Sequence, residues 1–342
     1  MIKLAINGYG RIGRCVLRAL VESPHRDSMQ VVAINEIADT ATVVHLTRYD
    51  STHGRFRGEL ALEGELLHVN GQPVRLLRQP EIQDLPWAEL EVDVVLECTG
   101  SFTERSVAAR HLERGAGRVL FSQPAQADVD ATIVYGINHD LLNDSQQIVS
   151  AASCTTNGIV PVITALDDAF GIDTGTITTI HSAMNDQPVL DAYHNTDLRK
   201  TRAAGTNIIP IDTGLARGVE RILPEMAGRF TAQALRVPVQ NVSAMDLVVS
   251  VQRDTSVAEV NTALQSASDS AFCGVLGYTA EPLASSDFNQ DPHSCIVDAG
   301  QTRVSGRRLV KVLVWFDNEW GYANRMLDVV RHWCGPSTSE RQ

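Results

Sequence analysis

The segment that ends at Gly13 constrains the fold of this chain more than any other. The apolar run at residues 3–7 is followed directly by Gly8-Tyr9-Gly10-Arg11-Ile12-Gly13, which has the G-x-G-x-x-G spacing. Apolar residues then recur at helical spacing through residues 12–20. A strand, a glycine loop and a helix in this order are the fingerprint of a dinucleotide-binding domain, in which the phosphates meet the helix N-terminus. The predicted contacts with the dinucleotide are made by Gly10, Arg11, Ile12 and Gly13.

A second apolar run, residues 31–34, ends at Asn35 and Glu36, about 20 residues after the glycine loop. An acidic side chain here can hydrogen-bond both ribose hydroxyls and would repel a 2′-phosphate, so Glu36 predicts NAD rather than NADP. The alternative is that Glu36 is an ordinary solvated loop acid. Two more strand ends are expected at the cofactor: Thr99 follows the run at residues 92–98, and Ser122 closes the run at 118–122.

Composition limits the remaining possibilities. A chain of 342 residues with 44% hydrophobic and 20% charged residues can form two domains with cores of their own. Its formal net charge of -12 argues against nucleic acid as the main partner, and no apolar run approaches the ~20 residues of a membrane span. The six cysteines show no C-x-x-C pair, and the N-terminus enters a strand directly. A reduced, cytoplasmic location is therefore expected.

The residues around Cys154 indicate a reactive cysteine. Cys154 lies between small hydroxyl residues and Asn157, just before the apolar run at residues 159–163. With Ser153 as a helix N-cap, Cys154 would lie in the first helical turn, where the helix dipole and unpaired N–H groups favour a thiolate. His181 closes a strand-like run at residues 176–180. We expect Cys154 and His181 to meet as nucleophile and base, and the alternative is a buried structural thiol.

The chain divides into two halves with different patterns. Strand-like and helical segments alternate in the first half, which predicts a mainly parallel sheet. The second half has longer strands with period-two segments, typical of an antiparallel or mixed sheet covered by helices on one face. The expected fold is therefore α/β, with a Rossmann-type dinucleotide-binding domain and an α+β catalytic domain. The expected boundaries are 1–153 for the first domain, joined by a C-terminal helix at 319–342, and 154–318 for the second.

Five motifs in order make the chain resemble the glyceraldehyde-3-phosphate dehydrogenase superfamily from end to end. They are residues 7–14 around the glycine loop, Arg48-Tyr49-Asp50-Ser51-Thr52-His53-Gly54, residues 153–157, Arg236-Val237-Pro238, and residues 315–322. Within the superfamily the chain is more similar to the erythrose-4-phosphate dehydrogenase branch, through residues 34–36, His181-Ser182-Ala183-Met184, Asp186-Gln187 and residues 287–294. The triose-phosphate branch usually has threonine where Met184 stands, and another hydroxyl residue where Asp186 stands.

The resemblance also implies individual roles. Cys154 matches the nucleophile, His181 its base, and Asn318 the amide that orients the nicotinamide. The implied phosphate-binding residues are Ser153, Thr155, Thr213, Gly214 and Arg236. Arg199 in the polar loop at 186–205 would add positive charge, unless it is simply a solvated surface residue. Many relatives have a second cysteine where Gly158 stands, and the chemistry does not require it. No metal site is expected.

Three functions remain open from the sequence. The first is NAD-dependent oxidation of erythrose 4-phosphate through a cysteine thioester that water hydrolyses, a step that the resemblance ties to pyridoxal phosphate synthesis. The second is a phosphorylating glyceraldehyde-3-phosphate dehydrogenase, against which Met184 and Asp186 count. The third is a catalytically silent binding or redox-sensing protein, which intact Cys154 and His181 disfavour. The expected partners are a sugar-phosphate aldehyde and further copies of the chain in a homotetramer.

Overall fold

The computed structural model describes residues 1–194 and 197–335, and these form two compact units. The first unit contains residues 1–153 together with the chain from Ala323 onward, and the second contains residues 154–322. Residues 336–342 of the expected C-terminal helix, and two residues of the polar loop, lie outside the described part. Within that part, no helix is long and apolar enough to cross a membrane.

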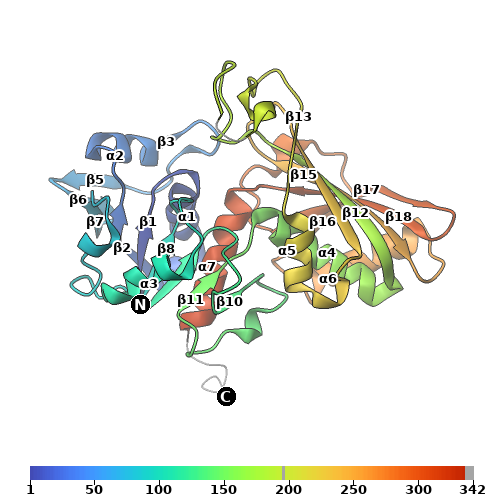
Figure 1. Cartoon of the computed structure of the whole chain (residues 1–342), viewed down its shortest axis with the longest axis horizontal. Coiled ribbons are helices and arrows are strands. Elements are labelled where there is room, and N and C mark those ends of the chain that lie inside the picture. Colours follow the sequence, from blue (N-terminus) through green and yellow to red (C-terminus); the bar gives the residue numbers. More distant parts are fainter. Residues whose placement is uncertain (195–196, 336–342) are drawn as a thin grey trace. The chain divides into compact units, whose positions relative to one another are not determined.

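The first unit is built on one sheet (Figure 1). Among the described residues its strand order is β10-β11-β9-β8-β1-β2-β7-β6-β5. The strands are β1 (Ile2–Asn7), β2 (Met29–Asn35), β5 (Leu60–Glu63), β6 (Leu66–Val69), β7 (Gln72–Leu77), β8 (Val94–Glu97), β9 (Arg118–Phe121), β10 (Ala131–Thr132) and β11 (Ile148–Ser150). Its helices are α1 (Arg11–Glu22), α2 (Thr40–Arg48) and α3 (Arg105–Glu113), with a small separate ribbon of β3 (Tyr49–Asp50) and β4 (Gly54–Arg55).

Parallel pairing gathers the functional strand ends of this unit. β1 pairs in parallel with both β2 and β8, so that Asn7 lies opposite Asn35 on one side and Glu97 on the other. Because these are the last residues of their strands, they lie together at the carboxyl edge of the sheet. Ligands of open α/β sheets bind at this edge. The topology therefore places the glycine loop, which follows β1, next to the residues that follow β2 and β8.

The second unit has a mixed sheet with the order β13-β14-β12-β15-β18-β17-β16 among the described residues. Its strands are β12 (Ile172–His181), β13 (Ile209–Ile211), β14 (Phe230–Arg236), β15 (Ser243–Val251), β16 (Leu276–Thr279), β17 (Cys295–Ser305) and β18 (Leu309–Phe316). Its helices are α4 (Cys154–Phe170), α5 (Leu215–Ile222) and α6 (Val257–Asp269). The β12–β14 and β16–β17 pairs are parallel and the others antiparallel.

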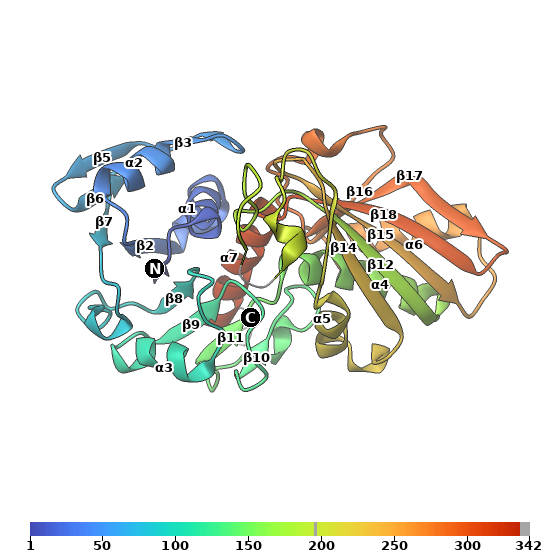
Figure 2. The ribbon, with the colours of Figure 1, turned by 45° about the horizontal axis from the view of Figure 1, so that its top comes forward.

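Alternating burial explains why the strands of the second unit form one covered sheet. In β18, Val310, Val312 and Val314 are fully buried while the residues between them are less so. α4 contacts β12, β15 and β17, and α6 contacts β16 and β17, so both helices lie against this sheet, as Figure 2 shows. The period-two pattern buries one face of each strand under the helices and leaves the other face more exposed.

The last helix, α7 (Trp320–Cys334), contacts residues from the N-terminal part of the chain. From Ala323 onward it belongs to the first unit. Asp328 accepts a hydrogen bond from His25 at 2.8 Å, and the Trp333 carbonyl accepts one from Arg118. The first unit therefore depends on residues from both ends of the sequence.

The predicted fold class is confirmed: a Rossmann-like domain and a second α/β domain with a mixed sheet. Several elements differ from the expectations. The first sheet ends in an antiparallel meander, β7-β6-β5, that the strand–helix alternation did not predict. Of the strand-like residues 131–135, only Ala131–Thr132 form a strand, because Val134 enters a turn in which its N–H and carbonyl both bond Asn138.

Candidate active site

The glycine loop has the geometry of a dinucleotide cradle. Gly8 has φ +89°, and a Cβ there would lie 2.5 Å from the Thr99 nitrogen, so only glycine fits. A Cβ on Gly13 would lie 2.4 Å from the Gly8 carbonyl oxygen, so this glycine lets α1 pack against the loop. A Cβ on Gly10 would meet nothing within 4 Å. The open side at Gly10 is where a pyrophosphate can approach the N-terminus of α1.

Glu36 ties the loop to the end of β2. Its carboxylate accepts the Tyr9 N–H at 3.0 Å and the Ala38 N–H at 3.2 Å. Gly10, Glu36 and Thr99 line one cavity of about 540 Å³ at the carboxyl edge of the sheet. The acidic residue, the open glycine and the cavity fit a dinucleotide with free ribose hydroxyls. The guanidinium of Arg11 is instead bound to Asp50, which leaves the helix-end backbone as the part of Arg11 that can meet phosphate.

A buried polar network lies under this cavity. Glu97 is 1% exposed, and its carboxylate accepts hydrogen bonds from Asn7 Nδ2 at 2.6 Å and from the Thr99 N–H at 2.9 Å, besides the Thr99 hydroxyl. The Trp87 indole can only donate, so its 2.9 Å bond to His111 Nδ1 makes His111 Nε2 a donor to Glu97 at 3.2 Å. Glu97 therefore holds the ends of β1 and β8 in fixed positions.

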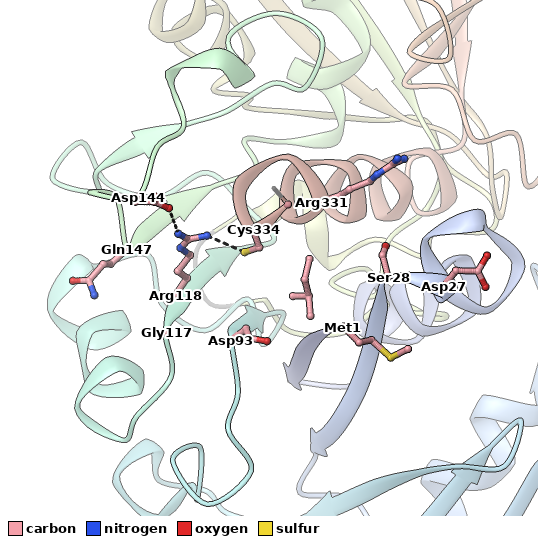
Figure 3. A pocket seen from close by; sticks show the side chains of 12 residues that line it. Met1, Asp27, Ser28, Asp93, Gly117, Arg118, Asp144, Gln147, Arg331 and Cys334 are labelled. Carbon is pink, nitrogen blue, oxygen red and sulfur yellow. Dashed lines mark hydrogen bonds and ion pairs between the residues drawn. The ribbon is translucent and has the colours of Figure 1, made fainter. Parts of the chain in front are cut away.

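A larger cavity in the first unit, of about 1020 Å³, lies at the opposite edge of the sheet (Figure 3). It is lined by Ile2, which begins β1, and by Arg118, which begins β9. Arg118 donates to Asp144 at 2.8 Å and to Cys334 Sγ at 3.0 Å, so its charge is already engaged. Dinucleotides bind at the carboxyl ends of parallel strands, so we expect the cofactor in the smaller cavity at that edge and not in this larger one.

His139, Asp140 and His332 also lie close together in the first unit, with their nearest ligand atoms within 4.8 Å of one another. His139 Nδ1 accepts the Gly136 N–H at 3.2 Å, so the neutral ring carries its proton on Nε2. That nitrogen is 3.9 Å from the Asp140 carboxylate. A metal ion would need its lone pair, so this cluster is not arranged as a metal site.

Cys154 is the first residue of α4, as expected, and its side chain is only partly buried. Ala152, two residues earlier, has φ +58°, a left-handed conformation that is uncommon outside glycine and often marks functional sites. The expectation of a thiolate at rest is not met. Burial raises the pKa of Cys154 to about 11, although N–H groups of the helix start and the charge of Arg236 act in the opposite direction. The resting thiol is therefore neutral.

His181 is oriented to act as a base. Its Nδ1 lies 2.8 Å from the Ser182 carbonyl oxygen, which can only accept, so Nε2 is left with the lone pair. Burial lowers the pKa of His181, which keeps the ring neutral. Arg236 and Glu319 act electrostatically on both Cys154 and His181. Among the described residues, Cys154 and His181 are not joined by a hydrogen bond.

Asn318 is held by two buried serines. Its Oδ1 accepts from the Ser182 hydroxyl and from the Ser243 hydroxyl, both at 2.9 Å. The residue before Ser243, Val242, has φ +62°, which is strained for a β-branched side chain. With Oδ1 fixed in this way, Asn318 presents Nδ2 as a donor, the atom needed to bind the carbonyl of a nicotinamide carboxamide.

Arg236 lies next to His181, because these residues are register partners in β14 and β12. The side chain is buried, and its Nη1 donates to Asp186 at 2.7 Å and to Gln187 at 3.0 Å. Asp186 also accepts from Lys200 at 3.0 Å. The sequence predicted Arg236 as an anion-binding residue, and the structure shows that part of this capacity is used by a carboxylate of the chain itself.

The remaining predicted residues are less closely gathered. Ser153 and Thr155 flank Cys154 and are partly buried. Thr213 and Gly214 line a cavity of about 590 Å³ between β13 and α5, and Thr213 accepts the Leu215 N–H at 3.2 Å. The side chain of Arg199 is exposed on its loop. Ser122 follows β9 and hydrogen-bonds the partly buried Cys98 thiol.

The structure explains why glycine stands at position 158. A Cβ there would lie 2.8 Å from Cε of Met245 and 3.1 Å from the Ser294 carbonyl oxygen. The Cys295 thiol donates to the Gly158 carbonyl at 2.7 Å and fills the adjoining space. A second cysteine on this turn of α4 would therefore need its neighbours to move.

Sequence reasoning gave no role to Glu97, Ser182 or Ser243, because each acts by holding another residue. Ser182 could have been found from its position directly after the predicted base. Glu97 directly follows three apolar residues at the end of its strand, and a charged side chain in such a place is a signal of a buried polar role.

Comparison with known families gives two matches. The family model described as "Glyceraldehyde 3-phosphate dehydrogenase, NAD binding domain" matches residues 2–105. The model described as "Glyceraldehyde 3-phosphate dehydrogenase, C-terminal domain" matches residues 153–318. Together they cover more than half of the chain. The first match contains the glycine loop and Glu36, and the second runs from the residue before Cys154 to Asn318.

Proposed function

Since the chain belongs to the glyceraldehyde 3-phosphate dehydrogenase family and is an NAD-dependent dehydrogenase, we propose that it oxidises D-erythrose 4-phosphate to 4-phospho-D-erythronate. In this reaction Cys154 forms the covalent intermediates and water releases the product. The acid would serve pyridoxal phosphate synthesis, as the resemblance to the erythrose-4-phosphate branch implies.

Catalysis begins with the sulfur of Cys154. Its attack on the C1 aldehyde carbon forms a C–S bond, breaks the C–O π bond and gives a thiohemiacetal. The thiol is neutral at rest, so its proton leaves sulfur as the bond forms and ends on the former carbonyl oxygen, which becomes the thiohemiacetal hydroxyl. The N–H groups at the start of α4 stabilise the charge that develops. The partial exposure of Cys154 supports this role, since a nucleophile must reach a substrate.

His181 is the base for the oxidation. Its Nε2 accepts the hydroxyl proton of the thiohemiacetal while the C1–H bond breaks, and the product on the enzyme is a thioester. Bound NAD supplies the hydride acceptor. Asn318, fixed by its two serines, orients the nicotinamide carboxamide through Nδ2. Water then attacks the thioester carbonyl, the C–S bond breaks and the acid leaves.

The observation that carries the choice of substrate is Met184. It lies three residues after His181 and is 46% exposed, so an exposed apolar side chain stands at the position where the resemblance places a hydroxyl in triose-phosphate enzymes. Losing one designed hydrogen bond weakens binding of the shorter sugar by about 1–3 kcal/mol. Arg236 then remains the main cation to hold the phosphate of a longer substrate.

A homotetramer in the cytoplasm is also part of this proposal. The loop around residues 184–208 exposes several large apolar side chains, which supports contact with further copies of the chain: Val189, Leu190, Tyr193, Leu198 and Ile208. Sedimentation at micromolar concentration tests the assembly, and a monomer would refute it. All six cysteines are free thiols, which is consistent with a reducing compartment.

The function is tested by following NADH formation with erythrose 4-phosphate and with glyceraldehyde 3-phosphate, each in phosphate-free and in phosphate-containing buffer. We expect a higher kcat/KM for erythrose 4-phosphate and no need for phosphate. Faster oxidation of the triose, only when phosphate or arsenate is present, would instead establish the phosphorylating function.

A further inference from the structure

Only part of the buried Arg236 guanidinium in the second unit is available to ligands. Arg236 is 6% exposed, and both of its side-chain hydrogen bonds leave from Nη1, to Asp186 at 2.7 Å and to Gln187 at 3.0 Å. Among the described residues, its Nε is buried without a hydrogen-bond partner. A buried donor without a partner costs free energy, so this edge of the guanidinium is prepared for a ligand that is not part of the chain.

Asp186 is firmly held in its position. Its Oδ1 bonds Arg236, and its Oδ2 bonds Lys200 Nζ at 3.0 Å. Partial burial raises the pKa of Asp186, but the hydrogen bonds from the two cations outweigh it, and the pKa falls below its ordinary value. The carboxylate is therefore charged at neutral pH, beside the groups that surround His181.

The geometry of a guanidinium limits what Arg236 can still bind. Its Nε and Nη2 hydrogens point along one edge and can bind two oxygens of a single phosphate. The Nη1 side, which could serve a second anion, is occupied by Asp186. A phosphate dianion brought to that side would meet a carboxylate, and like charges at such short range repel.

We propose that Asp186 is a specificity-determining residue that restricts Arg236 to one phosphate, so that water rather than inorganic phosphate resolves the thioester. This inference rests on the proposed function. The substrate's own phosphate takes the Nε edge. In hydrolysis a water oxygen bonds to the thioester carbon, a water proton goes to a base, the C–S bond breaks, and sulfur leaves as the thiolate. In phosphorolysis a phosphate oxygen would form the new bond instead, and that phosphate would have to approach Arg236 on the side that Asp186 occupies.

The decisive variant is Asp186→Asn, which keeps the shape of the side chain and removes its charge. Asp254→Asn is the matched control: Asp254 is also partly exposed and also bonds two cations, Arg308 at 2.7 Å and Arg307 at 3.3 Å. It follows Val251, which pairs with Ile172 at the end of β12 opposite to His181. Asp186→Glu, which restores a carboxylate, is the conservative rescue.

Two measurements on the NAD-loaded full-length protein test the proposal. The first is the dissociation constant of inorganic phosphate by calorimetry. The second is the ratio of acyl phosphate to acid formed from erythrose 4-phosphate, read by ³¹P NMR. Removing the negative charge beside Arg236 should tighten phosphate binding about 10- to 100-fold in Asp186→Asn. Acyl phosphate should then appear, while Asp254→Asn and Asp186→Glu should match the wild type.

The outcomes separate this inference from the proposed function. Unchanged phosphate affinity and no acyl phosphate in a folded Asp186→Asn protein would overturn the role of Asp186 and leave the dehydrogenase activity intact. A wild-type protein that needs phosphate for turnover would overturn the proposed function itself. An equal gain in phosphate affinity in Asp254→Asn would show that only net charge matters, and the inference would fail.

Discussion

Replacing Glu97 with glutamine should weaken both the fold of the first unit and its affinity for NAD. The carboxylate accepts four hydrogen bonds, whereas a glutamine amide has one accepting oxygen and one donating NH₂ group. The side chain has to choose which pair of donors faces its NH₂. The cost of the substitution follows from that choice.

The network disfavours one of the two orientations. An NH₂ toward Asn7 would force the Asn7 amide to flip. Asn7 Oδ1 accepts from Asn35, and Asn35 is fixed by the backbone N–H and carbonyl of Gln79, both at 2.9 Å. The NH₂ therefore turns toward Thr99, whose hydroxyl can reverse but whose N–H is left without its acceptor.

The magnitude follows from these bonds. Two retained bonds change from charged to neutral acceptors at about 1 kcal/mol each, and one partly exposed N–H loses its acceptor at about 1 kcal/mol. The smaller desolvation cost of the amide offsets part of this sum, so the loss of unfolding free energy should be about 2–3 kcal/mol. Because Asn7 and Thr99 line the cofactor cavity, NADH affinity should fall by roughly tenfold or more.

Urea unfolding and NADH fluorescence titration measure the two effects. Glu113→Gln, an exposed residue on the same helix as His111, controls for the chemistry of the change. If Glu97→Gln is as stable as this control and binds NADH as tightly as the wild type, the network does not hold the cofactor site in the way described.

Four further predictions follow from the site and its charges. Cys154→Ala should abolish NADH formation while NAD still binds, whereas Cys98→Ala should stay active if stable; substantial turnover by the former would end the covalent mechanism. His181→Asn should slow hydride transfer by roughly 10²–10⁴-fold. Because burial lowers the pKa of His181, the apparent pKa of the acid limb in the pH profile of wild-type kcat/KM should lie below the ordinary ~6.5 of histidine. An apparent pKa above that value would contradict the assignment of His181 as the base. Glu36→Ala should narrow the preference for NAD over NADP, and equal wild-type efficiency with both cofactors would remove Glu36 from the ribose site. Asp50→Asn should lower the free energy of unfolding by about 2 kcal/mol at pH 7, because burial raises the pKa of Asp50 but hydrogen bonds from Arg11 and from backbone N–H groups outweigh it and hold this pKa at about 2. Since the pKa is depressed in the folded state, the difference from the wild type should be complete above pH ~5 and vanish as pH falls toward 2. A pH-independent difference would show that the charge of Asp50 is not the cause.

The parts of the site that sequence predicted are those set by local chain geometry. The glycine loop, Glu36 at the end of β2, and Cys154 at the start of α4 all depend on a residue's place at the end of one element. Hydrophobic periodicity locates such ends well, because a strand or helix stops where its apolar pattern stops. His181 at the end of β12 was found for the same reason.

The parts that sequence missed depend on pairing between distant segments. Asp186 meets Arg236 because β12 and β14 are neighbours, and no pattern within either segment contains that information. The charge state of Cys154 also depended on packing: a helix start favours the thiolate, and the degree of burial, which decides the sign of the shift, is a property of the whole fold. Register and burial are tertiary quantities, so local rules cannot supply them.

Because most of α7 belongs to the first unit, this unit cannot be completed until after the second unit has been synthesised. The ribosome releases the continuous segment of residues 154–322 before the helix that completes the cofactor unit has emerged. The second unit can therefore fold while the first unit still lacks Asp328, the partner of His25, and the Trp333 carbonyl, one of the acceptors of Arg118. Translation that stops early would yield a chain with Cys154, His181 and Asn318 already made and an unfinished NAD-binding core, so the last residues made decide whether the first ones can hold the cofactor.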